Sequence, residues 1–543
     1  MTYSTPGVYL REVNAFGSGV VGVETAVPAF IGYTETAHDP VSGRPVTAPI
    51  PISSLLDYQA AFGGAAASSF VIRQTLSANP AFIANITIAD GTVISSGFDL
   101  TLAAPPTGPD RFCLHQQMEL FFANGGGACW VMSAGSHAIP GATVTASDLL
   151  AAIEAVGQIV GPTMLVVPEA CQLPQADYAN VACAMLDQAG RLQDRVAILD
   201  LPGCLEATNL AALTLAQQNL WSAIAPQADH LSYGAVYAPA LATTVLQPRD
   251  VRFPVLAGGD NRTINAILTA QAVQLFSGPN LATVQSAIAA AFPLTGVTTN
   301  TPALSGDATA YPAPVTPGAA GLAAWQQRLD DLLTSALPIY VEIDHLVADY
   351  LNVQPASGAM AGVWTRSDMQ SGVWSAPANI TLAHVAAPLC PLGDADQGGF
   401  NVPVNGMAIN LVRTFPTRGT VPWGARTLDG NSDDYRYVQV RRTLIYIEQS
   451  IKAALQQYVF AANDAGTWET VIASVSTFLT GLWRQGGLMG ATATDAFSVQ
   501  CGLGTTMNAQ NVLDGYMVVT VALQMIHPAE FITLTFSQAM QAS

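Results

Sequence analysis

Three short motifs in this sequence contain residue types that could do chemistry. Residues 17–22 read GSGVVG, which satisfies the GxGxxG spacing of a loop that binds a dinucleotide phosphate. Residues 394–399 read DADQGG, which partly fits an acidic calcium-binding loop, and residues 504–508 read GTTMN, which is similar to a loop that carries a catalytic serine. Each motif predicts a site only if other residues complete it.

None of the three motifs is complete. GSGVVG is not followed by the expected helix or acidic residue, which favours a glycine hinge at Gly17, Gly19 and Gly22. DADQGG lacks the closing glutamate of a calcium loop and is interpreted as a surface turn. GTTMN has threonine in place of the serine nucleophile and lacks a convincing histidine partner motif. His527, beside a proline, is interpreted as a packing or hydrogen-bonded turn residue.

Other catalytic and metal-binding signals are also missing from the sequence. It lacks the GxSxG, HExxH and Walker A motifs and any paired zinc motif. The seven cysteines are scattered without a CxxC pair, which argues against a zinc site or a disulfide framework. We therefore predict a protein that is not an enzyme and uses no cofactor or metal. A hydrolase built on an α/β core stays open as an alternative.

The composition indicates a protein that buries much of its surface in an assembly. Half of the 543 residues are hydrophobic and only 10% are charged, against roughly 25% in ordinary soluble domains. No run of about 20 uncharged apolar residues predicts a membrane span. The start of the chain also lacks the pattern of a secretory signal, so synthesis in the cytoplasm is expected.

The charge is strongly acidic and unevenly distributed. A net charge of −19 argues against general binding of nucleic acid, which needs clustered cations. Residues 1–400 carry 29 acidic and 11 basic side chains, whereas residues 401–543 carry 9 and 8. Lys452 is the only lysine, and arginine, whose planar fork pairs well with carboxylates, supplies the other cations. The two regions are expected to face different surroundings.

The hydrophobic pattern predicts an α/β core in the middle of the chain. Between about 112 and 290, helical stretches alternate with buried-strand runs, which is typical of a largely parallel sheet. The predicted helices are 114–124, 149–160, 178–191 and 210–223, and the strand runs are ACWVMSA, TMLVVP, RVAILDLPG and LSYGAVYAP. Residues 293–321 are interpreted as a long loop, with a helix over 319–336 after it.

The C-terminal part predicts two helices and two closing strands. Over 435–458 the apolar residues mark one helical face, and Arg441, Glu448 and Lys452 fall on another, which predicts a mixed-charge outer side. A helix over 467–484 follows, and then the runs YMVVTVALQMI and EFITLTFSQ. Both chain ends are short strands without an obvious local partner, and unpaired strands invite pairing with another molecule.

An ordered series of motifs gives the chain a resemblance to a known family. The series is TPGVYLREV, AVPAFIGYTE, MELFFANGGGACWVMSAG, RVAILDLPG, YGAVYAPAL, PASGAMAGVWTRSDMQSGVWSAPAN, NGMAINLVRTFPTRGTVPWGARTL, YRYVQVRRTLIYIEQSI and HPAEFITLTF. In this order it resembles the tail sheath proteins of contractile phages and related injection systems, over nearly the whole chain. The chain departs from the family pattern at Ser375, where a lysine is common, and in the loop 293–321.

The resemblance implies a fold and a division into domains. The fold class is α/β (α+β overall), with a subtilisin-like α/β sheath domain, a C-terminal domain with a mixed sheet, extended terminal arms and an outer β-rich insertion. The implied divisions are 1–25 for the N-terminal arm and hinge, 26–111 for the outer β segment, 112–424 for the sheath domain and 425–543 for the C-terminal domain and arm.

The resemblance also implies a mechanism and partners. In sheaths both arms donate strands to neighbouring subunits, which form stacked six-fold rings that contract around an inner tube. The residues carried over for strand exchange are Val8, Tyr9, Leu10, Val20, Val21, Glu530, Phe531, Ile532, Leu534 and Phe536, and Arg441, Arg442 and Lys452 are expected to contact the tube or a neighbour.

The implied partners are further copies of the chain, an inner tube protein, baseplate and terminal cap proteins and possible sheath paralogues, with no nucleic acid and no direct membrane insertion. The machine would be a phage, a released particle or a membrane-anchored device. A non-contractile surface or capsid lattice protein stays open as a further alternative.

Overall fold

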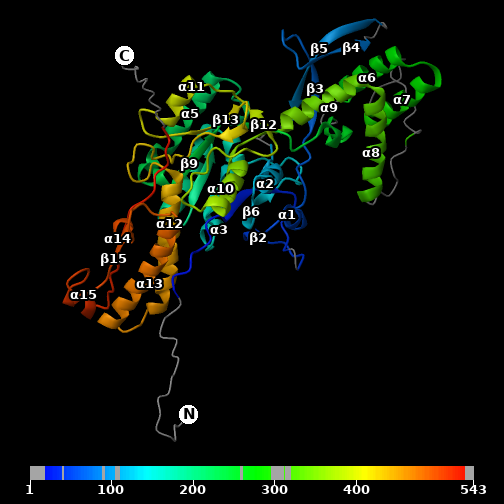
Figure 1. Cartoon of the computed structure of the whole chain (residues 1–543). Helices are drawn as coiled ribbons and strands as arrows, with labels where there is room; N and C mark the ends of the chain where they lie inside the picture. The colour runs from blue at the N-terminus through cyan, green and yellow to red at the C-terminus, as the bar shows by residue number, and fades with distance from the viewer. Residues whose placement is uncertain are drawn as a thin grey trace, which may run out of the picture.

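An eight-stranded sheet forms the centre of the protein. The computed structural model describes residues 19–39, 42–87, 92–103, 111–256, 261–294, 311 and 319–531 (Figure 1). The strand order is β14-β13-β9-β8-β7-β1-β6-β2. The six inner strands run parallel, and the edge strands β2 and β14 are antiparallel to their neighbours. The bounds are β1 Pro28–Thr34, β2 Ile50–Ile52, β6 Cys129–Ser136, β7 Met164–Val166, β8 Val196–Asp200, β9 Gly234–Ala238, β13 Asn410–Phe415 and β14 Gly419–Pro422.

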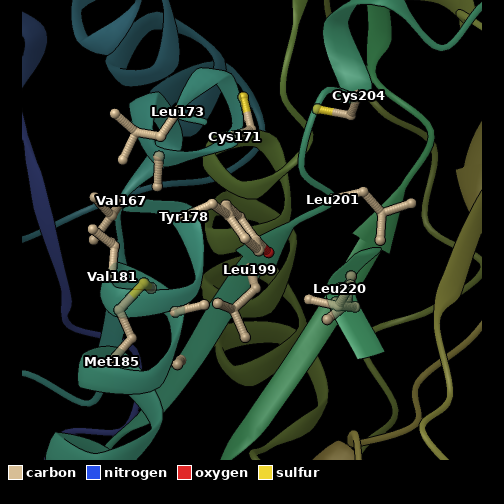
Figure 2. Close-up of a cluster of buried hydrophobic side chains, with 14 of the residues drawn as sticks. Val167, Cys171, Leu173, Tyr178, Val181, Met185, Leu199, Leu201, Cys204 and Leu220 are labelled. Atoms are coloured by element: carbon tan, nitrogen blue, oxygen red, sulfur yellow. The ribbon is translucent and has the colours of Figure 1, made fainter. Parts of the chain in front are cut away.

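Helices cover both faces of this sheet because its strands are apolar on both sides. Side chains alternate along a strand, so in β1 Ile31 enters the core on one face and Phe30 enters the core on the other. The first face packs against α3 Ala146–Gly157, α4 Gln175–Leu192 and α5 Leu210–Ile224. Figure 2 shows part of that core, where Tyr178 and Val181 of α4 lie near Leu199 of β8. The second face packs against α1 Leu55–Phe62, α2 Leu114–Ala123, α10 Ser357–Ser371 and part of α12 Val438–Leu455.

A separate helical and β unit projects from one end of the sheet (Figure 1). Its three-stranded sheet has the order β3-β5-β4, and four helices share one hydrophobic core with it. The bounds are β3 Phe70–Thr75, β4 Phe82–Thr87, β5 Val93–Leu102, α6 Arg262–Leu275, α7 Gly278–Ala291, α8 Ala319–Ala336 and α9 Pro338–Leu351. A small sheet of β11 Val353–Gln354, β10 Leu241–Thr243 and β12 Val385–Pro388 lies where the chain returns to the body.

The structure corrects the predicted outer segment 26–111. Residues 28–34 form β1 in the interior of the central sheet, between β6 and β7, and residues 50–52 form its edge strand β2. Only β3 to β5 belong to the projecting unit, and they share its core with helices from residues 262–351, which were assigned to the sheath domain. The sequence placed these pieces wrongly because their packing partners lie far away along the chain.

Most predicted elements are confirmed. The four helices and four strand runs between 112 and 290 match α2 to α5 and β6 to β9, and the helix predicted over 319–336 is α8. Of the predicted loop 293–321, residues 295–310 and 312–318 lie outside the described residues. The mixed α/β class is confirmed, while the finer likeness to subtilisin and the other domain boundaries stay predictions.

The C-terminal part packs two long helices against a pair of antiparallel strands. Helix α13 Ala465–Arg484, α12 and the antiparallel pair β15 Phe497–Gln500 and β16 Thr520–Leu523 enclose a small core around Ile447, Val475 and Leu479. Two short helices, α14 Ala493–Ala496 and α15 Ala509–Leu513, flank the pair, and α11 Asp394–Asn401 lies on the body near β13. The sheet described in this part is antiparallel and two-stranded, where a mixed sheet was expected.

Candidate arm-docking sites along helix α12

Helix α12 joins the two main parts of the molecule. Its sequence is free of glycine and proline, and it follows Tyr437, whose extended backbone ends the preceding loop. Val438 and Ile445 belong to the core under the central sheet, whereas Ile447 belongs to the core of the C-terminal part. Because one continuous helix enters both cores, residues docked along it are placed relative to the whole subunit.

Arg442 holds the entry of the chain into β1. Its guanidinium group makes a two-pronged ion pair with Asp368 of α10, at 2.8 Å from Nη1 to Oδ1 and 2.6 Å from Nη2 to Oδ2. The same Nη2 donates to the carbonyl oxygen of Thr25 at 3.0 Å, and the group lies over the Trp364 ring. The side chains of Arg442 and Asp368 are only 3% and 4% exposed. Such a buried pair is sensitive to the loss of either partner.

Arg441 is also used inside the subunit. Its guanidinium carbon lies 3.8 Å from the ring centre of Tyr435 and 4.3 Å from that of Tyr233, and Nη2 donates to Ser232 Oγ at 2.9 Å. Both arginines are therefore buried, and the predicted outer position of Arg441 is wrong. Little of either guanidinium group is left for a tube or neighbour contact. Lys452 is exposed, and its contact stays a prediction.

The described part of the N-terminal arm, which begins at residue 19, lies along the second half of α12. Val20 packs against the C-terminal core, and the backbone N–H of Val23 donates to Ser450 Oγ at 3.1 Å. A Cβ atom on Gly22 would lie 2.1 Å from the hydroxyl oxygen of Tyr446, so the close approach of the arm to α12 requires glycine there. We call residues 20–25 the N-terminal root.

Several residues predicted for the N-terminal arm cannot be compared with the structure. Val8, Tyr9, Leu10 and Gly17 lie outside the described residues. A Cβ atom on Gly19 would meet open space, and Val21 is exposed. The hinge role of the glycines and the exchange of Val20 and Val21 stay predictions.

The last described residues of the C-terminal arm bind an ion cluster beside the start of α12. The carboxylate of Glu530 accepts from Arg426 Nη2 at 2.6 Å, from Asn401 Nδ2 at 2.7 Å and from the Tyr437 hydroxyl at 2.9 Å. Phe531, the next residue, is exposed. Glu530 is thus held by its own subunit, which argues against its predicted part in strand exchange. Ile532, Leu534 and Phe536 lie outside the described residues, so exchange of the arm stays a prediction.

An open apolar groove runs between α12 and β16. Its volume is about 520 Å³, and its walls include Ile447 and Ile451 on the helix and Val521 and Leu523 on the strand. Within the described residues β16 pairs with β15 alone, which leaves its second edge free beside the groove. A two-stranded sheet is marginal in water, and a free edge beside apolar side chains suits an added strand. Lys452 lines the same groove.

The three candidate motifs have structural roles in the fold. DADQGG forms the start of α11 rather than a plain surface turn, because Asp396 accepts from the Gly393 N–H and Asp394 pairs with Arg413 at 2.7 Å. In GTTMN the Thr506 hydroxyl donates to the carbonyl oxygen of Val518 at 2.7 Å. The segment from Gly19 runs to β1 without an intervening helix. The His527 ring packs edge-on against Tyr437, in line with the packing interpretation.

Buried acids elsewhere act as anchors of the backbone. Burial raises the pKa of Glu169 to about 7, and its carboxylate accepts from the N–H groups of Tyr33 and Cys113 at 2.8 and 3.0 Å. Burial likewise raises the pKa of Asp200 to about 7, and Oδ1 accepts from the N–H groups of Ala356 and Ser357 at the start of α10. The cavity beside Asp200 is about 10 Å³, too small for a substrate.

Two further features are absent from the described residues. No group of three or more histidine, cysteine, aspartate or glutamate side chains there could hold a metal ion. Among the helices described, none is both long and apolar enough to cross a membrane.

Sequence reasoning missed the partners that fix the arms. Asp368, Asn401, Arg426, Tyr446 and Ser450 were not singled out, although all five lie in or beside motifs that carry the resemblance. Arg426 was the most accessible to reasoning, because an arginine at the end of an apolar stretch commonly needs a carboxylate partner.

Comparison with known proteins assigns the C-terminal part to a family. Residues 431–539 match the model of the phage tail sheath C-terminal domain. These residues are thus similar to the C-terminal domain of phage tail sheath proteins. The match includes α12, the groove and the C-terminal ion cluster apart from Arg426 and Asn401.

A curated relative and solved structures are also similar to this chain. The tail sheath protein of Burkholderia phage BcepMu is 28% identical over 156 residues, which span 28% of this chain and only 32% of that relative. A sheath complex of an extracellular contractile injection system, PVC, aligns over 99% of both chains at 23% identity, with a TM-score of 0.54. The contracted baseplate structure of the anti-feeding prophage aligns over all of both chains at 21% identity, with a TM-score of 0.59. The chain therefore has the fold of contractile sheath proteins, and the expected resemblance is confirmed.

Proposed function

We propose that this chain is the structural sheath subunit of a contractile injection system or phage tail. The observation that carries the proposal is the family match of residues 431–539 together with a sheath fold along the whole chain. Copies of the chain would polymerise as stacked six-fold rings around an inner tube protein. The subunit would be made in the cytoplasm and become part of a phage-like particle.

The groove beside β16 is the proposed binding site for a strand of a neighbouring subunit. A strand from a neighbouring subunit would pair with the free edge of β16 and set its apolar side chains against Ile447 and Ile451. Each added backbone hydrogen bond contributes roughly 0.5 to 1.5 kcal/mol net, and the buried apolar surface adds to it. The arms that donate such strands would link the subunits while the rings rotate and approach one another.

Contraction in this proposal needs no nucleotide in the sheath subunit. The extended polymer would be kinetically trapped, and new contacts between subunits would supply the work on shortening. Related structures of a contracted sheath and of a baseplate support a polymer that starts on baseplate proteins. In this proposal a terminal cap protein would end the polymer. Nucleic acid, membrane insertion and catalysis have no part in this role.

Electron microscopy of the expressed protein, alone and with its neighbouring tube gene product, tests the proposal. We expect helical tubes in two lengths, with the chain ends entering adjacent subunits. Tubes of a single fixed length would favour the non-contractile lattice. Discrete monomers with self-paired ends would contradict the sheath function, and hydrolysis abolished by one substitution would favour the hydrolase.

A matched pair of variants tests the groove itself. Val521 lines the groove, whereas the adjacent Ala522 points to the opposite, exposed face of β16. Val521→Asp places a charge where the donated strand would pack, and we expect it to abolish tubes while the subunit stays folded by circular dichroism. Ala522→Asp carries the same charge and should assemble as the wild type does. Equal assembly of both variants would contradict strand addition at this groove.

A further inference from the structure

The chain leaves the C-terminal part before its arm begins. Strand β16 ends at Leu523, and Met525 still bridges to Leu488 in the C-terminal part. From there the chain crosses to the body, where His527 packs on Tyr437 and Glu530 binds Arg426. Figure 1 shows this last described segment rising along α12 toward α11. The C-terminal arm therefore starts from the body and not from the strand pair β15–β16 that precedes it.

The contact at Glu530 has the geometry of a clamp. Arg426 approaches the carboxylate side-on, with Nε 2.9 Å from Oε1 and Nη2 2.6 Å from Oε2. Asn401 and Tyr437 donate to the two oxygens from separate elements, and the Arg426 guanidinium group lies over the Tyr437 ring. Side-chain exposure is 5% for Arg426 and 19% for Glu530. Planar two-pronged pairing of this kind fixes direction as well as distance.

The charges around Glu530 favour its ionised form. Burial raises the pKa of the carboxyl group, but hydrogen bonds from Arg426, Asn401 and Tyr437 outweigh burial and hold the pKa below its usual value. Burial, followed by the hydrogen bond to Glu530, raises the pKa of Tyr437, so its hydroxyl keeps its proton. Arg436 beside Tyr437 and the His527 ring are the other charged or titratable groups at the cluster.

Helix α12 relates this clamp to the N-terminal root. Glu530 is held at Tyr437, immediately before α12, and the N-terminal root is held at Tyr446 and Ser450. At a rise of 1.5 Å per residue, the 13 positions from Tyr437 to Ser450 span about 20 Å. Glu530 and the N-terminal root are therefore both tied to α12, the first beside its start and the second along its second half.

We propose that Arg426 and Glu530 are positioning residues that latch the C-terminal arm to the body, so that the chain is fixed to its own subunit as far as Glu530. The latch fixes where a donated strand leaves each subunit relative to the N-terminal root. This inference rests on the proposed function for its purpose, but the latch itself is a property of a single subunit.

Hydrogen exchange of dilute, unassembled subunits tests the latch. We expect amides at 525–531 to exchange about tenfold faster in Glu530→Gln, because the neutral amide cannot hold the arginine fork. Arg426→Lys keeps the charge but lacks the fork, and it should fall between Glu530→Gln and the wild type. Asp433→Asn removes the exposed partner of Arg436 nearby and serves as the matched control, with no change expected at 525–531.

A pH profile separates a latch from simple packing. The pKa of Glu530 is lowered in the folded chain, so the stabilisation is present above the unfolded pKa of about 4.3 and is lost as the pH falls through the folded value. After correction for intrinsic rates, wild-type protection at 525–531 should fall below about pH 4, while Glu530→Gln should lack this step. Unchanged exchange in both variants, or an acid step retained in Glu530→Gln, would overturn the proposal. Because the readout needs no tubes, failure of the sheath function would leave this result unaffected.

Discussion

The two arm roots are fixed to the same helix by different forces. The N-terminal root is held by apolar packing of Val20, by the close approach of Gly22 to Tyr446, by the Val23 N–H and by the Arg442 guanidinium group, which donates to the Thr25 carbonyl oxygen. The C-terminal root, residues 525–531, is held by the ionised side chain of Glu530. Because apolar packing and an arginine guanidinium group respond little to pH and the glutamate carboxylate responds strongly, the two roots should differ in their response to pH.

The largest expected effect comes from Arg442→Ala. The substitution leaves Asp368 as a buried, uncompensated charge and removes the donor to Thr25, so unfolding free energy should fall by about 3–5 kcal/mol. Urea denaturation measures this loss. Arg191→Ala breaks the exposed pair with Asp187 and is the matched control, with a loss below about 1 kcal/mol. Equal losses would show that the root is not anchored by a buried charge.

A smaller effect is expected from Gly22→Ala. The new methyl group would meet the Tyr446 hydroxyl, and moving that ring should cost about 1–3 kcal/mol. Gly19→Ala meets open space and should change stability by less than about 0.5 kcal/mol. Thermal unfolding of the two variants side by side is the measurement. If Gly22→Ala left the stability unchanged, the close approach of the N-terminal root to Tyr446 would not require glycine.

The smallest effect is a selective release by acid. As the pH falls from 7 to below the lowered pKa of Glu530, protection of amides at 525–531 should fall by about tenfold, whereas amides at 20–25 should change little after correction for intrinsic rates. The sign follows from the lowered pKa of Glu530, whose stabilising charge is lost as the pH falls. One exchange experiment reports both roots in the same sample. Parallel release of both roots would remove the distinction between them.

The sequence predicted elements well where the signal is periodic and local. Helix α8 was predicted with the bounds it has, and the amphipathic helix over 435–458 contains α12. The burial of Arg441 and Arg442 could not be predicted from the same pattern, because a helical pattern places charged residues in solvent. Their partners Tyr233 and Asp368 come from segments about 70 to 200 residues earlier in the chain.

The docking sites were predicted only in outline. The resemblance implies an arm at each end of the chain, but local sequence did not separate Glu530, an anchor within the subunit, from the residues predicted for strand exchange after it. The place of β1 inside the sheet was missed for a similar reason, because its partners β6 and β7 begin about 100 residues later. Parallel pairing over such distances leaves no short-range signal.

The single lysine gives the groove a built-in chemical handle. Lys452 is exposed on α12 and lines the wall beside β16, and every other cationic side chain in the sequence is an arginine. An amine-reactive dye would therefore mark one side chain in each subunit, at the place where a neighbour's strand is proposed to bind. Its emission would follow sheath growth in real time without any engineered cysteine.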